Sequence, residues 1–169
     1  MNIKKTLICA LVLAAAVLSA GCVEREIVKN QEEIVPDFSI KDDIEIDWEQ
    51  AREDCEAALE EDEYPYGKYI DFEVDEEGNA VRVIWPLNEG SPKEAAPEYG
   101  EALIRALNDA IAVQDFKYAL SSQESYGGYW ELHDVKVEVF DDSDILFPDN
   151  YYVNDTIPAG SNKPVELAY

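Results

Sequence analysis

The 169-residue sequence is poor in basic residues and has only one histidine and three cysteines. Its 13 Lys and Arg stand against 38 Asp and Glu, a formal net charge of −25. This balance argues against nucleic-acid binding, because phosphate contacts need a surface of Lys and Arg side chains. A zinc site is also disfavoured, because such sites combine several Cys and His ligands.

The remaining composition is that of a globular protein. Apolar residues make up 47% of the chain, with ten Tyr, five Phe and three Trp. These residues can bury a core, which a disordered acidic chain cannot do. The length corresponds to one domain with appendages, since domains contain about 100 to 200 residues.

The N-terminus has the organisation of a bacterial export signal. Met1–Lys5 is a short basic region, and residues 6–20 are almost wholly apolar. Fifteen residues are too few to cross a bilayer as a helix, which takes about 20, but they suit a signal peptide. The next residues, Leu18-Ser19-Ala20-Gly21-Cys22, resemble the lipobox of bacterial lipoproteins. An ordinary secretory signal with an incidental cysteine is the alternative.

The lipobox resemblance implies that residues 1–21 are removed and that the Cys22 thiol carries a diacylglyceryl group. The protein would then be anchored through this lipid to the cell membrane or outer membrane, on the extracytoplasmic side. Cys9 would leave with the signal peptide, so Cys55 would be the one free thiol and no internal disulfide could form. We interpret residues 22–46 as the lipidated cysteine and an acidic tether, with a reach of about 25–30 Å.

Residues 47–141 carry the patterns of an α+β domain. An apolar stripe predicts a helix over residues 47–61, with Asp47 as N-cap and Gln50 completing a capping box. Strict alternation then predicts a β-hairpin over residues 70–85, with its turn around Gly78. A second helix is expected over residues 97–113, and a third strand over Tyr129–Phe140 with a bulge near His133 and Asp134.

The expected fold is a small, mainly antiparallel sheet with two helices packed on one face, in the order helix-strand-strand-helix-strand. Residues 142–169 are expected to form an irregular tail that packs on the domain, with room for one short edge strand. The predicted core consists of Ile70, Phe72, Val74, Val81, Val83, Trp85, Leu103, Leu107, Val135 and Val137.

This order of elements resembles the C-terminal domain of the TonB family over about Asp47 to Phe140. The residues that carry the resemblance are Phe72, Val74 and Gly78 of an F-x-V-x-x-x-G hairpin, Val83 and Trp85, Phe116–Ala119, and Val135–Phe140. Tyr118 replaces the proline of that family's F-x-P-A segment. The resemblance implies a module that binds peptides by adding strands. Energy transduction is not implied, because those transducers have a membrane span and a long Pro-rich spacer.

Few residues are candidates for chemistry. His133 beside Asp134 suggests a general base, but neighbouring strand residues point to opposite faces, so a histidine without a catalytic role is the favoured interpretation. Cys55 lies on an apolar stripe among acids, which raise a thiol pKa, so we interpret it as structural. The tyrosines of the last third, Tyr126, Tyr129, Tyr151, Tyr152 and Tyr169, are expected to pack the sheet rather than form a recognition patch.

Calcium is the one metal that the acidic residues could attract. Asp141, Asp142 and Asp144 are weak candidate ligands, and Asp75-Glu76-Glu77 forms a second acidic cluster, but neither has the D-x-D-x-D-G pattern. The leading hypothesis is a non-catalytic binding module at the cell envelope, with no cofactor. Its partner would be an envelope protein, peptide or glycan with a basic face. The alternatives are a calcium-dependent acidic surface protein and, third, a small envelope enzyme.

Overall fold

The computed structural model describes residues 44–75, 77 and 79–168. The predicted signal peptide, Cys22 and the tether up to residue 43 lie outside the described residues. None of the helices in the described part of the chain combines the length and the apolar character that crossing a bilayer requires.

Four strands form one sheet in the order β1-β2-β3-β4. The strands are β1 (Asp71–Asp75), β2 (Ala80–Leu87), β3 (Asp134–Asp141) and β4 (Val153–Ile157). β1 pairs with β2 and β3 with β4 in antiparallel fashion, whereas β2 and β3 are parallel. The fold class expected from the sequence, α+β with a mainly antiparallel sheet, is therefore confirmed.

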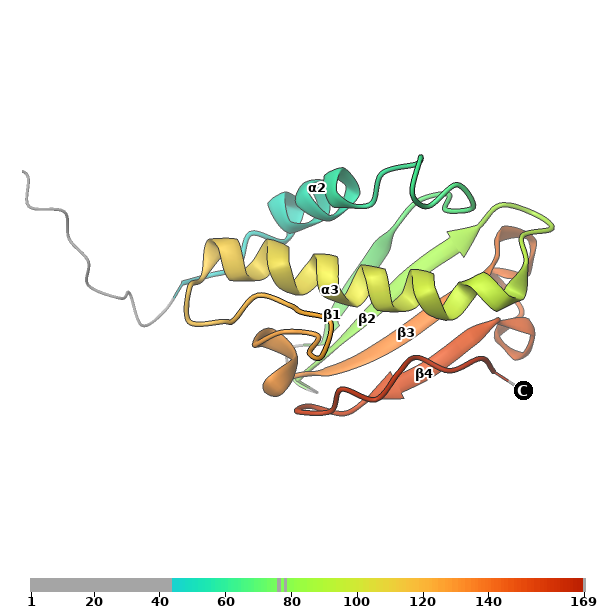
Figure 1. Ribbon diagram of the computed structural model, residues 1–169. Coiled ribbons are helices and arrows are strands. Elements are labelled where there is room, and N and C mark those ends of the chain that lie inside the picture. Colours follow the sequence, from blue (N-terminus) through green and yellow to red (C-terminus); the bar gives the residue numbers. More distant parts are fainter. Residues whose placement is uncertain (1–43, 76, 78, 169) are drawn as a thin grey trace, which may run out of the picture. The chain divides into compact units, whose positions relative to one another are not determined.

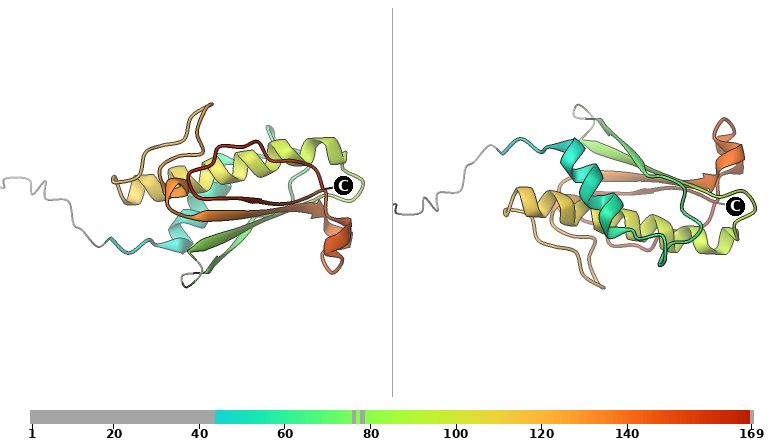
Figure 2. Two further views of the ribbon diagram at one scale, coloured as in Figure 1. Left: turned by 90° about the horizontal axis from the view of Figure 1, so that it is seen from below. Right: turned by 90° about the horizontal axis from the view of Figure 1, so that it is seen from above.

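Two helices cover one face of this sheet. They are α2 (Trp48–Ala58) and α3 (Ala96–Gln114), and α3 makes the crossover between the parallel strands β2 and β3. α3 runs along the sheet with α2 beside it (Figures 1 and 2). The start of α2 meets the end of α3, because the Asp47 main-chain N–H donates to Gln114 Oε1 at 2.7 Å.

The core lies between the sheet and the helices. Every residue of the predicted core is buried except Val74 near the end of β1, which is partly buried. Ala51 and Cys55 contribute the buried face of α2. Beyond residue 141, Val153 and Ile157 of β4, together with Val165, belong to the same core. The expected short edge strand is thus β4.

Three boundaries differ from the sequence-based expectation. β2 continues beyond residue 85 through Pro86 to Leu87, because it still pairs with β3 there. The third strand begins at Asp134, and residues Tyr129–Glu131 form a 3-10 turn, so the predicted strand from Tyr129 with a bulge is wrong. The turn is fixed to α3 because the Trp130 indole N–H donates to the Ile104 carbonyl at 2.9 Å. The first helix ends at Ala58, with Leu59 as its C-cap.

Of the two reciprocal interactions of the predicted capping box, only the one made by the Asp47 side chain is confirmed. Asp47 Oδ1 accepts from the main-chain N–H groups of Glu49 and Gln50, each at 3.1 Å. The side chain of Gln50 does not return to Asp47, because its amide donates to Asp54 at 3.0 Å instead.

Candidate functional site

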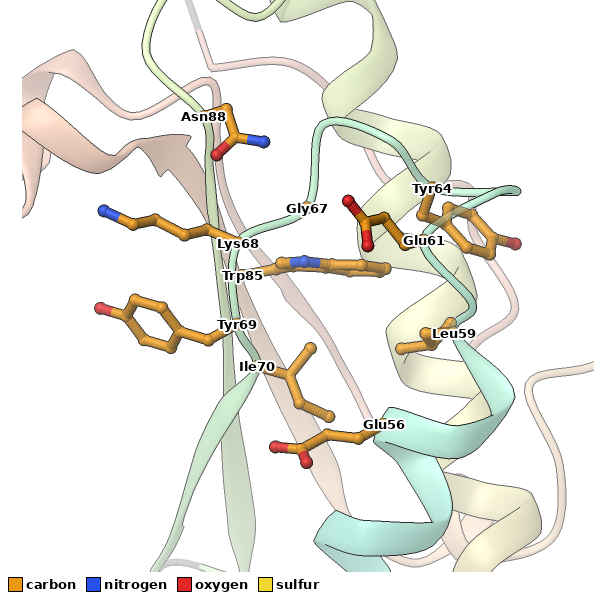
Figure 3. Close-up of a pocket in the computed structure, with 10 residues that line it drawn as sticks. All are labelled: Glu56, Leu59, Glu61, Tyr64, Gly67, Lys68, Tyr69, Ile70, Trp85 and Asn88. Atoms are coloured by element: carbon orange, nitrogen blue, oxygen red, sulfur yellow. The ribbon is translucent and has the colours of Figure 1, made fainter.

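A hollow beside the sheet lies where α2 ends and the chain returns to β1. It has a volume of about 530 Å³, and we call it the aromatic pocket (Figure 3). Its lining residues come from the end of α2, the segment between residues 59 and 70, and β2. They are Glu56, Leu59, Glu61, Tyr64, Gly67, Lys68, Tyr69, Ile70, Trp85 and Asn88.

Trp85 forms the floor of the aromatic pocket. Its ring centroid lies 5.4 Å from that of Tyr64 and 4.8 Å from that of Tyr99, and Tyr64 meets Tyr99 edge-on at 5.2 Å. Tilted and edge-on aromatic pairs of this kind stabilise each other beyond their buried area. The floor is therefore an aromatic surface built from three segments that are distant in sequence.

The chain crosses this floor at Gly67, where a side chain would not fit. A Cβ atom at Gly67 would come within 2.6 Å of Trp85 Nε1 and 2.8 Å of Cζ2. The crossing segment is tied to the end of β2, because Lys68 N–H donates to Pro86 O at 3.1 Å and Asn88 N–H donates to Tyr66 O at 2.8 Å. Tyr66 N–H also donates to the Tyr99 hydroxyl at 3.0 Å.

Two carboxylates, Glu56 and Glu61, line the aromatic pocket from the end of α2 and the residues after it. Both residues are exposed, and neither forms an ion pair with any other residue that the structure describes. The ammonium group of Lys68 points away from Trp85 (Figure 3) and pairs with Asp142. The one cation of the lining is thus held by another carboxylate.

The local electrostatics follow from this excess of carboxylates. Burial, together with the negative charges of Asp54 and Glu56, raises the pKa of the Cys55 thiol to about 12. The pKa of Tyr64 is raised by burial and by Glu63 and Glu98. The hydrogen bond to Asp142 raises the pKa of Lys68, which keeps this amine protonated. The aromatic pocket therefore combines an apolar floor with a negatively charged lining.

Such an arrangement suits a ligand with an apolar stem and a positive end. The methylenes of a lysine or arginine side chain can lie along aromatic and aliphatic surface while the charged head reaches carboxylates. Because Lys68 is protonated and bound to Asp142, its amine is not a free nucleophile.

The predicted calcium ligands are held by separate protein donors. Asp141 Oδ1 accepts from the Ser143 hydroxyl at 2.7 Å, and its Oδ2 accepts from Gly90 N–H at 2.9 Å; these bonds lower the Asp141 pKa. Asp142 pairs with Lys68, and Asp144 accepts from the Asn150 amide at 2.9 Å. Among the described residues no three His, Cys, Asp or Glu side chains are placed to hold a metal ion together.

His133 packs against Tyr129. Its ring stacks on that of Tyr129 at a centroid distance of 4.0 Å, and its Nδ1 lies 2.9 Å from the Tyr129 carbonyl oxygen. Asp134 is turned elsewhere and accepts from Ala159 N–H at 2.7 Å. The structure therefore does not bring His133 and Asp134 together as a base and its orienting acid.

Cys55 and the late tyrosines have the packing roles expected of them. Cys55 is fully buried, and its thiol is free. Tyr126, Tyr129 and Tyr151 are buried, and Tyr152 is half-buried. The hydroxyl of Tyr126 donates to Lys163 O and that of Tyr151 to Ile145 O, both at 3.0 Å. Tyr169 lies outside the described residues.

The aromatic pocket was not predicted from the sequence. From the sequence we expect only that the first helix ends before Tyr64-Pro65-Tyr66-Gly67. Its two tyrosines reach Trp85 and Tyr99 only through the tertiary fold. The local signal was the unusual pairing of aromatics with Pro and Gly.

Comparison with known proteins adds no identification, since no family model, curated protein or solved structure matches this chain.

Proposed function

We propose that the protein is a lipid-anchored extracytoplasmic lipoprotein whose domain is a non-catalytic binding module for a partner with a basic face. The lipobox-like residues 18–22, after a basic and an apolar region, support the anchor at Cys22. The observation that carries the binding role is the aromatic pocket, in which Glu56 and Glu61 stand unpaired among described residues beside an aromatic floor.

The partner is an envelope protein or peptide that presents Lys or Arg to this pocket. Its side-chain stem packs near Trp85 and Tyr64, and its charge lies between the two glutamates. Each exposed ion pair contributes only about 0.2–1 kcal/mol, so one side chain gives weak binding. Affinity must therefore come from further contacts, while the excess of negative charge speeds association.

The test is capture of a partner from detergent-solubilised envelope with the tagged, full mature chain as bait. The variant Glu56→Gln/Glu61→Gln removes the two pocket charges without removing side-chain volume. Glu77→Gln/Glu131→Gln is the matched control, because it removes the same charge from two exposed residues outside the aromatic pocket.

We expect the pocket variant to lose the partner and the control to retain it, and the association rate of the wild type to fall as salt rises. Equal capture by both variants would show that the aromatic pocket is not the binding site. A specific partner whose association rate does not change with salt concentration would contradict the electrostatic part of the proposal.

The calcium-dependent alternative gains no support from the positions of Asp141, Asp142 and Asp144, whose oxygens accept from different protein groups. Calcium titration by calorimetry separates it from the proposed function. A saturable, stoichiometric heat that Asp142→Asn and Asp144→Asn abolish would favour the alternative.

A further inference from the structure

One end of the domain exposes large apolar side chains. Phe116, just after α3, is 87% exposed, more than any other large hydrophobic residue that the structure describes. Val113 in the last turn of α3 and Leu120 in the following loop are each 61% exposed. A single exposed apolar side chain needs no explanation, but three of them within residues 113–120 mark a candidate contact surface.

The described chain enters the domain at this same end. Asp47, immediately before α2, is bound on both main-chain groups by Gln114, the last residue of α3. Both views of Figure 2 and Figure 1 place the start of α2 at the end of α3. A chain anchored at Cys22 therefore reaches the domain beside Val113 and Phe116.

The acidic residue next to Phe116 in the sequence, Asp115, is not exposed. The carboxylate of Asp115 is turned inward, with its side chain only 2% exposed. Lys117 pairs with it at 2.8 Å and is itself 45% exposed. Residues 115–117 thus present an aromatic ring and an ammonium group to the outside, a combination suited to a lipid headgroup region.

We propose that Val113, Phe116 and Leu120 form a membrane-contacting end that lies against the lipid bilayer in which Cys22 is anchored. The inference rests on the proposed lipid anchor and adds an orientation to it. The anchor holds the domain near the bilayer and so raises the effective concentration of this surface at the lipid. A surface too small to bind a membrane by itself can then remain in contact with it.

This orientation directs the aromatic pocket away from the lipid. The pocket borders Tyr99 in the first turn of α3, whereas the membrane-contacting end follows the last turn. At the usual helical rise of about 1.5 Å per residue, Tyr99 lies about 22 Å along α3 from Gln114, the last residue of the helix. The domain would therefore hold its binding site toward partners rather than toward the bilayer.

The test places the same fluorescent label at either end of the full mature protein, reconstituted in phosphatidylcholine vesicles. Phe116→Cys labels the membrane-contacting end. Leu146→Cys is the matched control, because Leu146 is also apolar and 79% exposed and follows the far end of β3. Cys55 is buried with its pKa raised to about 12, so it will not compete for the label. Quenching by brominated acyl chains is compared with quenching by aqueous iodide.

We expect lipid-phase quenching to be several-fold stronger at residue 116 than at residue 146, and iodide quenching to show the reverse. Val113→Ser/Leu120→Ser should weaken the lipid-phase quenching at residue 116, whereas Ile145→Ser/Phe147→Ser should not. Equal quenching at both ends of a protein with acylated Cys22 would overturn this inference but not the proposed anchor. A mature protein whose mass shows no acyl group would overturn the proposed anchor and, with it, the basis of the inference.

Discussion

Gln114, the last residue of α3, bonds both main-chain groups of Asp47, the N-cap of α2. Its Oε1 accepts from Asp47 N–H at 2.7 Å, and its Nε2 donates to Asp47 O at 3.0 Å. In a capping box the residue three positions after the cap satisfies the N–H of the cap. Here a residue 67 positions away does so, which fixes the start of α2 to the end of α3.

Gln114→Ala should therefore destabilise the domain. A hydrogen bond contributes about 0.5–1.5 kcal/mol, so we expect a loss of about 1–2 kcal/mol in the free energy of unfolding. Urea denaturation of the Val23–Tyr169 chain measures it, with Gln123→Ala, at an exposed loop position, as the control. A loss no larger than that of the control would show that the pair is not formed in solution.

A second prediction concerns the buried carboxylate of Glu138 on β3. Its side chain is 3% exposed, accepts from Arg82 Nε at 2.9 Å and pairs with Lys136 Nζ at 2.7 Å. Burial alone would raise the pKa of Glu138, but the bonds from Arg82 and Lys136 outweigh burial and hold it below its usual 4.5. Arg82 also pairs with Glu73 at 2.8 Å, which links three strands.

The pH dependence follows from this lowered pKa. The folded state binds the Glu138 proton less tightly than the unfolded state, so the stabilisation is complete above about pH 4.5 and is lost as pH falls through the lower folded pKa. Glu138→Gln should be less stable than wild type at pH 7, and the difference should shrink toward pH 3. Denaturation of both proteins across this range tests it; a difference that stays constant with pH would contradict the ion-pair account.

A third prediction compares two glycines with positive φ. Gly127 has φ +108° and faces the buried Asn108, so that a Cβ would lie 2.0 Å from Asn108 Nδ2. Asn108 fixes the loop after α3, accepting from Tyr129 N–H and donating to Ala119 O, each at 3.0 Å. Gly90 has φ +77° with nothing within 4 Å of its would-be Cβ.

Gly90→Ala should cost about 1–2 kcal/mol, the penalty of left-handed backbone alone. Gly127→Ala should cost more than this, because it also displaces Asn108 and leaves buried polar groups unpaired. Thermal or urea unfolding of the two variants gives the comparison. Equal losses would mean that the loop moves away from Asn108 without penalty.

The sequence was most informative where apolar residues recur with the period of a half-buried strand or helix. The alternation of Phe72, Val81 and Val83 with polar residues predicted the buried face of the hairpin, and all three are in the core. The helical stripe that includes Leu103 and Leu107 likewise predicted the buried face of α3. These patterns are local consequences of two-residue and 3.6-residue periods.

The sequence was least informative where contacts join distant segments. The turn at Tyr129–Glu131 depends on Trp130 reaching Ile104, and no local pattern distinguishes it from a strand. The aromatic pocket depends on Gly67 lying against Trp85. The proposed anchor at Cys22 is the opposite case, since it is a sequence signal that lies outside the described residues.

The anchor is the claim on which the orientation of the domain depends, and intact mass spectrometry of the mature protein tests it most directly. The full-length chain is expressed in a bacterium that processes lipoproteins, and the mature protein is extracted and weighed beside the Cys22→Ser variant. We expect a chain that begins at Cys22 and carries the added mass of a diacylglyceryl group, which the variant lacks. A wild-type mass that equals an unmodified polypeptide, with membrane association unchanged in Cys22→Ser, would contradict it.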